Sequence, residues 1–371
     1  MGSIAPDPQR THKVVCLDAY LCPVPKFDFP HECVEYENTV GEDLIIERAK
    51  DATIVITTRA PMSARTISLC PRLEMISLMA AGANIIDMEA CRQRKITVCN
   101  SPSGAASSVA EHAFALYFAA KRKIVDLHHI TLEGKEWPRA QSAFHLYPFV
   151  PRVLEHEVLG IVGYGGIGKR MEAIGRGLGM KVLIAERKHT AGTSLRPGRT
   201  AFETVLKTAT VLMLGCPLDA ESLDMITETE LRQMRRDATI VNVARGGVLN
   251  ESALVQALNE GWIASAATDV FALEPATAIS TPLISKHPPN LTVSPHVAWY
   301  ADATLEKLQQ IVRGNLEAYI ADQPQNLVNG SWASHRRSAP DSSDRVQSLT
   351  AAWFTAESEA PRNSLDSSVP R

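Results

Sequence analysis

The stretch VLGIVGYGGIGKRMEAIGRGLGMKVLIAER (158–187) decides the architecture of the chain. An apolar run, VLGIV, leads into the glycine-rich segment GYGGIG (163–168), and a helical pattern follows. A second apolar run, MKVLIAE (180–186), then ends on an acidic residue. A strand, a glycine turn and a helix in this order are typical of the first βαβ unit of a doubly wound parallel sheet, although a strand-turn-helix that binds nothing has the same outline.

Similar apolar runs recur on both sides of this unit. The strand-like segments are KVVCLD (13–18), TIVITT (53–58), EMISLMA (74–80), ITVCN (96–100), TVLMLG (210–215), ATIVNV (238–243), AAT (266–268) and LTVS (291–294). Helical spacing is found at 41–50, 63–69, 85–94, 107–129, with Ser108 as its cap, and 301–320. This alternation predicts an α/β fold with parallel sheets. Residues 130–156 are expected to form a loop, and the Ser-rich segment 331–371 a disordered tail.

Composition excludes several classes of protein. The 371 residues include 45% hydrophobic and 21% charged residues with a net charge of −3, so we expect a globular protein without a nucleic-acid partner. The 7 cysteines are odd in number and form no C-x-x-C pair, which argues against a disulfide framework and a metal site. Free cysteines fit a reducing compartment, and no apolar run is long enough for a membrane span, so a cytoplasmic protein without a membrane partner is expected.

The glycine-rich segment predicts a dinucleotide site. Gly163 permits a tight turn, Gly165 lets a pyrophosphate approach the backbone, and Gly168 allows close packing of helix and strand. The helix that begins here offers free N–H groups and a partial positive charge. The cofactor is expected against Gly163, Gly165, Gly166, Ile167 and Gly168.

The residues after the next strand bear on the choice of cofactor. Glu186 is placed to accept hydrogen bonds from the adenosine ribose hydroxyls, which favours NAD. Arg187 and Lys188 follow at once and are able to hold a 2′-phosphate, so NADP stays open. For both residues a solvated loop position is the other interpretation, and we favour it for Lys188.

Three downstream motifs carry a family resemblance. They read IVNVARGGVLNESALVQAL (240–258), ATDVFALEP (267–275) and VSPHVAW (293–299). In this order, behind a dinucleotide segment, they resemble the D-isomer-specific 2-hydroxyacid dehydrogenases over residues 13–330, and PHVAW looks most like the glycerate dehydrogenase (hydroxypyruvate reductase) branch. The resemblance implies hydride transfer between NAD(P)H and a 2-keto or D-2-hydroxy acid, either a small one like hydroxypyruvate or glyoxylate or a bulkier 2-keto acid.

The resemblance also implies roles for three residues. His296 would exchange the proton on the C2 oxygen, because an imidazole titrates near neutrality. Glu274 would orient the imidazole and favour its protonated form. Arg245 would polarise the C2 carbonyl and clamp the carboxylate with two donors.

Further contacts follow from the same resemblance. The backbone near Ala81 and Gly82 would receive the substrate carboxylate. Cys216 and Pro217 would lie at the cofactor edge of the third strand, and Val243 and Ala244 beside the nicotinamide. Asp269 would either bond the cofactor carboxamide or cap the local turn.

The family has two Rossmann-like doubly wound domains, and the domain that binds substrate is discontinuous. By resemblance, residues 1–110 and 298–330 would form this substrate domain, and residues 111–297 the NAD(P)-binding domain. Relatives commonly form homodimers through the helix placed here at 107–129. A dinucleotide-sensing corepressor of the C-terminal-binding-protein type, with little turnover, is the alternative function.

Overall fold

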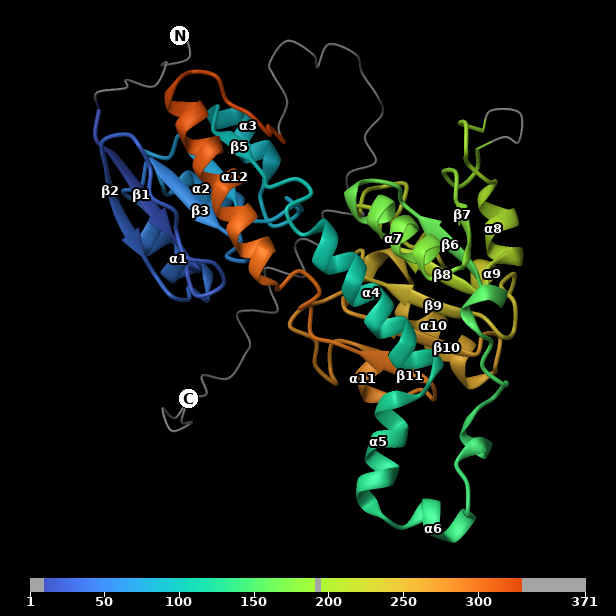
Figure 1. Cartoon of the computed structure of the whole chain (residues 1–371). Helices are drawn as coiled ribbons and strands as arrows, with labels where there is room; N and C mark the ends of the chain where they lie inside the picture. Colours follow the sequence, from blue (N-terminus) through green and yellow to red (C-terminus); the bar gives the residue numbers. More distant parts are fainter. Residues whose placement is uncertain (1–9, 191–194, 329–371) are drawn as a thin grey trace. The chain divides into compact units, whose positions relative to one another are not determined.

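The computed structural model describes residues 10–190 and 195–328, and these fall into two compact units. The first unit runs to Pro102 and resumes at Leu308, while the second comprises Ser103–Lys307 (Figure 1). The chain therefore changes unit close to, but not at, the expected boundaries 110/111 and 297/298. The reason is that helix α4 (Ala106–Lys121) packs along its whole length on the second sheet. The predicted tail from residue 331 lies outside the described residues.

The first unit is built on a five-stranded parallel sheet in the order β2-β1-β3-β4-β5. The strands are β1 (His12–Cys16), β2 (His31–Glu35), β3 (Ile54–Thr57), β4 (Met75–Leu78) and β5 (Thr97–Cys99). Helices α1 (Glu42–Ala49), α2 (Ala64–Ser68) and α3 (Met88–Arg94) alternate with them, and α12 (Asp302–Ile320) returns the chain to this unit. β2 was not expected, because its sequence HECVE lies at the edge of the sheet and lacks an apolar run.

The second unit contains a six-stranded parallel sheet in the order β11-β10-β9-β8-β6-β7. The strands are β6 (Val158–Val162), β7 (Lys181–Ile184), β8 (Val211–Leu214), β9 (Thr239–Asn242), β10 (Ser265–Thr268) and β11 (Leu291–Val293). Its further helices are α7 (Gly166–Gly177), α8 (Phe202–Thr208), α9 (Glu228–Leu231), α10 (Glu251–Asn259) and α11 (Pro282–Ser285). Two parallel α/β units confirm the predicted fold class.

Buried side chains cover both faces of the second sheet. Residues of α4 pack on one face with Leu159 and Val241, and residues of α8 and α10 pack on the other with Leu212 and Ile240. The strand order reverses at β6, which has β7 on one side and β8 on the other. In open α/β sheets, ligands bind at the carboxyl ends of the strands beside such a reversal.

The region 107–156 differs from the prediction. The expected single helix ends at Lys121, and α5 (Ile124–Glu133) starts a new helix after Lys123, whose φ is 50°. Residues expected to be loop include α6 (Glu136–Ala140), and α5 and α6 form an arm that projects from the second unit (Figure 1). Ser108 is not a cap: it lies inside α4, where its hydroxyl bonds the Ala105 carbonyl.

Candidate active site

The predicted residues of the second unit gather along one edge of its sheet. Because parallel strands point the same way, the segments that follow them emerge at the same edge. GYGGIG follows β6, Glu186 follows β7, and Cys216-Pro217 follows β8. Arg245 follows β9, Asp269 and Glu274 follow β10, and His296 follows β11. The candidate cofactor-binding and catalytic residues therefore lie along the same edge of the sheet, although they are far apart in the sequence.

The glycine segment has the shape that a pyrophosphate requires. Gly163 has a φ of 90°, and a Cβ on it would lie 2.5 Å from the backbone nitrogen of Cys216. A Cβ on Gly168 would lie 2.1 Å from the Gly163 carbonyl oxygen, so helix and turn touch there. A Cβ on Gly165 meets no described atom within 4 Å, which leaves room for a ligand at the start of α7. The residues present therefore fit a dinucleotide.

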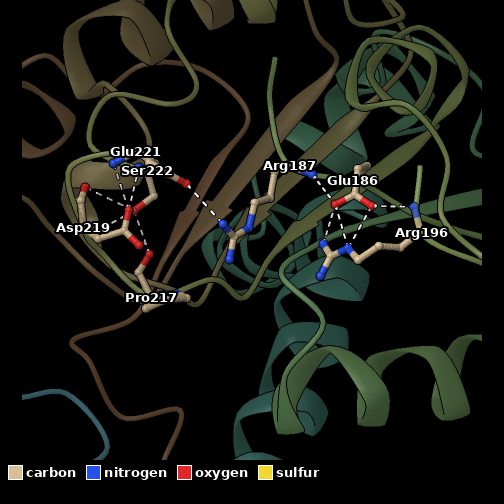
Figure 2. A network of polar contacts seen from close by, with 7 residues as sticks. All are labelled: Glu186, Arg187, Arg196, Pro217, Asp219, Glu221 and Ser222. Atoms are coloured by element: carbon tan, nitrogen blue, oxygen red, sulfur yellow. Dashed lines mark hydrogen bonds and ion pairs between the residues drawn. The ribbon is translucent and has the colours of Figure 1, made fainter. Parts of the chain in front are cut away.

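Glu186 is held by a neighbouring arginine (Figure 2). Its carboxylate accepts hydrogen bonds from Arg196 Nε at 2.9 and 3.0 Å, from Arg196 Nη2, and from the Arg187 and Arg196 backbone N–H groups at 2.9 and 3.1 Å. These bonds, led by the one from the Arg196 side chain, lower the pKa of Glu186 to about 2. Glu186, which was expected to bind the ribose hydroxyls, is thus already paired with Arg196. Sequence reasoning did not single out Arg196.

Lys188 is also committed elsewhere. Its ammonium lies 2.9 Å from the Met225 carbonyl oxygen and 2.9 Å from a Glu230 carboxylate oxygen. The side chain is 20% exposed, so the expectation of a solvated loop residue is not met. Lys188 thus anchors the loop after β7 to α9.

Arg245 stands where the buried strand β9 ends. Its Nη1 donates to its own Ala244 carbonyl at 2.8 Å, and no carboxylate within the described ranges forms an ion pair with it. Burial lowers the pKa of the guanidinium, and the negative charge of Glu274 opposes that effect. Val243 and Ala244 just before it are buried. A cation with so few protein partners is available to an anionic ligand.

Asn242 positions this turn, and sequence reasoning did not single it out. The Asn242 amide donates to the Arg245 carbonyl at 3.0 Å and accepts from the Ala244 N–H at 3.0 Å. The residue is 1% exposed. A buried asparagine inside the apolar run IVNVA was the signal for such a role, since buried polar groups require partners.

His296 and Glu274 form a close pair. His296 Nδ1 lies 2.5 Å from Glu274 Oε2, and the other oxygen of Glu274 accepts the Phe271 N–H at 2.9 Å. An ionised carboxylate only accepts, so Nδ1 carries a proton and Nε2 is left to exchange one. The imidazole is 35% exposed, whereas the Glu274 side chain is 10% exposed. This geometry suits a proton donor that acts through Nε2 and is oriented by the bond between Glu274 and Nδ1.

Asp269 supports the turn that carries His296. Its carboxylate accepts the Val297 and Ala298 N–H groups at 3.0 and 2.9 Å and the Ser294 hydroxyl at 2.6 Å. His112 Nε2 lies 2.9 Å from that hydroxyl. Burial alone would raise the pKa of Asp269, but the His112 imidazole, 3.5 Å from its carboxylate, and these hydrogen bonds outweigh burial and lower the pKa. Its contacts match the turn-capping alternative, while a bond to the carboxamide stays a prediction.

Ala81 and Gly82 belong to the first unit. They follow β4, with Ala81 exposed and its carbonyl bonded by the Asn100 amide at 2.6 Å. They too lie at the carboxyl ends of parallel strands, which is where a ligand of that sheet would be expected. Their predicted contact with a substrate carboxylate stays a prediction.

The sequence of the chain matches a known protein family. Residues 114–298 match the family model described as the D-isomer specific 2-hydroxyacid dehydrogenase, NAD binding domain. A glycerate dehydrogenase of Methylorubrum extorquens is 36% identical over 86% of this chain and 99% of its own. A hydroxypyruvate reductase of Blautia hydrogenotrophica is 30% identical over 85% of this chain and 99% of its own.

A solved structure shares the fold. An acyclic imino acid reductase, determined with NADPH and D-Arg, superimposes with a TM-score of 0.71 at 24% identity over 85% of this chain and 99% of its own. The relatives of 36% and 30% identity confirm the resemblance drawn from the three motifs. The chain belongs to the family of D-isomer-specific 2-hydroxyacid dehydrogenases, in the branch that contains glycerate dehydrogenases and hydroxypyruvate reductases.

Proposed function

We propose that this chain is an NAD(P)-dependent enzyme that reduces a small 2-keto acid of the hydroxypyruvate or glyoxylate type to the D-2-hydroxy acid. The observation that carries the proposal is the His296–Glu274 pair beside Arg245, on the sheet edge that also carries GYGGIG. The names of the relatives, glycerate dehydrogenase and hydroxypyruvate reductase, support this class of substrate.

Each residue has a separate task in the reduction. A dinucleotide held against GYGGIG would supply the hydride that C2 receives. His296 Nε2 delivers the proton to the C2 oxygen, and Glu274 stabilises the imidazolium that does so. Arg245 binds the carboxylate and polarises the carbonyl through its planar set of donors. In the first unit, the backbone N–H groups near Ala81 and Gly82 are our candidates for binding a substrate carboxylate.

The test is a matrix of NADH and NADPH against 2-keto acids of increasing side-chain size. We expect turnover with the small acids. His296→Ala should abolish turnover and keep dinucleotide binding, whereas His156→Ala, at an exposed histidine, should change neither. Retained activity in His296→Ala would contradict the assignment. A wild-type protein that binds dinucleotide but turns over none of the acids would favour the corepressor-like alternative.

We also propose that the protein is a homodimer that uses the arm of α5 and α6. Helix α5 has no buried residue, and Leu132 and Trp137 on the arm, with Phe144 and Val150 in the segment after it, are between 53% and 91% exposed. A second copy of the chain would cover this apolar surface. Sedimentation should show a dimer that Leu132→Asp with Phe144→Asp dissociates. Ile279→Asp, at a fully exposed residue off the arm, is the control, and a wild-type monomer would refute the proposal.

The cytosol is the compartment that we propose. All 7 cysteines are free, and a reducing environment keeps them so. Within the described ranges, no helix is long and apolar enough to cross a membrane. Fractionation of cells that express a tagged full chain tests the proposal, and recovery in a membrane or secreted fraction would contradict it.

A further inference from the structure

We propose that Arg196 binds the 2′-phosphate of an adenosine, so that this chain prefers NADP(H) to NAD(H). The inference rests on the proposed function, in which the second unit binds a nicotinamide dinucleotide. It departs from the expectation drawn from Glu186 alone, which favoured NAD. Arg196 lies ten residues beyond Glu186. It belongs neither to the glycine segment nor to the acidic end of the next strand, the two features from which the dinucleotide site was predicted.

The first step of the argument is that Glu186 has little capacity left for a ribose. One carboxylate oxygen accepts the Arg187 N–H together with Arg196 Nε and Nη2, and the other accepts Arg196 N–H and Nε (Figure 2). A carboxylate offers about four acceptor sites. NAD would therefore have to displace Arg196 before its ribose hydroxyls found an acceptor on Glu186.

The second step is that the same pairing removes the obstacle to a phosphate. An unpaired Glu186 would repel a 2′-phosphate, but here its charge is balanced by a guanidinium in direct contact. The Arg196 side chain is 54% exposed, and within the described part of the chain its Nη1 has no hydrogen-bond partner. Arg196 is thus held in place by Glu186 and still presents donors to solvent. Guanidinium donors of this kind suit phosphate oxygens.

The third step is that a second arginine is free to join. Arg187 meets Glu221 only at 3.7 Å, with both side chains more than 70% exposed (Figure 2). Such an exposed pair contributes little stability, so exchange of Glu221 for a phosphate costs little. Arg199 adds a third positive charge, since its guanidinium lies 4.5 Å from the ring centre of Tyr164 in the GYGGIG segment. Besides Arg196, two more guanidinium groups thus lie near Glu186 or the glycine segment, with Glu221 near Arg187 and Glu172 near Arg199.

The experiment measures binding at equilibrium, without a keto acid. Adenosine 2′,5′-bisphosphate and adenosine 5′-monophosphate are titrated into the full chain by calorimetry, and NADPH and NADH by fluorescence. We expect the bisphosphate and NADPH to bind about ten- to a hundredfold more tightly than their counterparts without the 2′-phosphate, from charge-assisted hydrogen bonds. Equal binding of each pair, or tighter binding of NADH, would overturn the inference.

Variants then separate a specificity role from a structural one. Arg196→Gln should weaken NADPH and strengthen NADH, because it removes the phosphate donor and frees Glu186 for the ribose. Glu186→Gln should strengthen NADPH and weaken NADH, since it removes the negative charge that contacts Arg196 and the acceptor for the ribose. A structural defect would weaken both cofactors together, and such a result in both variants would refute the role of Arg196.

A matched control is available in the first unit. Arg65→Gln removes a guanidinium that is 55% exposed and paired with Glu42 and Asp43, and it should change neither cofactor. The outcome also distinguishes the two proposals. A protein that turns over keto acids with NADH but ignores the 2′-phosphate refutes only this inference, whereas a protein that binds no dinucleotide refutes both.

Discussion

The two adjacent glycines of the ARGG segment, Gly246 and Gly247, should respond very differently to the same substitution. A Cβ on Gly246 would lie 1.8 Å from the Phe271 carbonyl carbon and 2.1 Å from the Ala272 nitrogen. Carbon atoms in contact are normally about 3.5 Å apart, so the 271–272 peptide would have to move by about 1.7 Å. These are backbone atoms, and no side-chain rotation relieves the overlap.

The displaced peptide adjoins the 270–271 peptide, whose N–H takes part in the proposed chemistry. The Phe271 N–H donates to Glu274 Oε1 at 2.9 Å, and the other oxygen of Glu274 bonds His296. A misplacement of about 1 Å in an active site is able to lower kcat by about a hundredfold. Overpacking against backbone should also reach the upper end of the usual range, about 3 kcal/mol. In a domain of this size, that corresponds to a Tm lower by about 6–12 °C.

Gly247→Ala supplies the control. Its Cβ would meet only leucine side chains, at 3.3 Å from Leu223 and 3.4 Å from Leu218. We expect kcat within about threefold of wild type and a small change in Tm, since side chains at such distances adjust by rotation. Both variants are assayed for kcat and KM with the best keto acid and for Tm by calorimetry. If Gly246→Ala behaved like Gly247→Ala, the inferred coupling of the ARGG segment to Glu274 would be refuted.

Three further outcomes are expected. Glu274→Gln should move the pH optimum of reduction to lower pH, because a neutral partner no longer stabilises the His296 imidazolium; an unchanged pH–rate profile would contradict the pairing. Ion pairs with two arginines outweigh the burial of Asp237 and hold its pKa at about 2, so its contribution to stability is complete above about pH 4 and is lost toward pH 2. Asp237→Asn should thus cost about 2 kcal/mol in urea unfolding at pH 7 and much less at pH 2.5, and an equal loss at both pH values would exclude this linkage. Under native conditions iodoacetamide should label only Cys33, the exposed cysteine, and labelling of Cys99, whose pKa burial raises to about 12, would show that the core opens.

The strands were largely predictable because buried parallel strands leave continuous apolar runs in the sequence. TIVITT and ATIVNV are of this kind, and β3 and β9 lie within them with every residue buried. HECVE shows the limit, since an edge strand with polar side chains has no such run. Its place in the sheet comes from pairing with β1, which no local pattern reveals.

The break between α4 and α5 shows why local patterns are insufficient for helices. Neither Gly nor Pro marks residues 121–124, and the apolar spacing continues through them. The chain turns because Lys123 adopts a φ of 50°, and its ammonium bonds Asn290 Oδ1 at 2.5 Å and Asp126 at 3.1 Å. Asn290 is 167 residues away. A tertiary contact thus ends a helix that the sequence alone would continue.

The surroundings of His296 show the same limit in the candidate site. The motif identifies the histidine, but not that its φ is 54°, a conformation that costs a residue with a side chain about 1–2 kcal/mol. That conformation is held from β10: the Asp269 carbonyl accepts the His296 N–H at 2.8 Å, and the Asp269 carboxylate accepts the next two N–H groups. Because Asp269 is 1% exposed, it acts on the histidine through the backbone. Burial therefore distinguishes His296, which is exposed enough to face a reactant, from Asp269, which fixes the direction of the histidine. The spacing of the motifs along the chain does not show this difference.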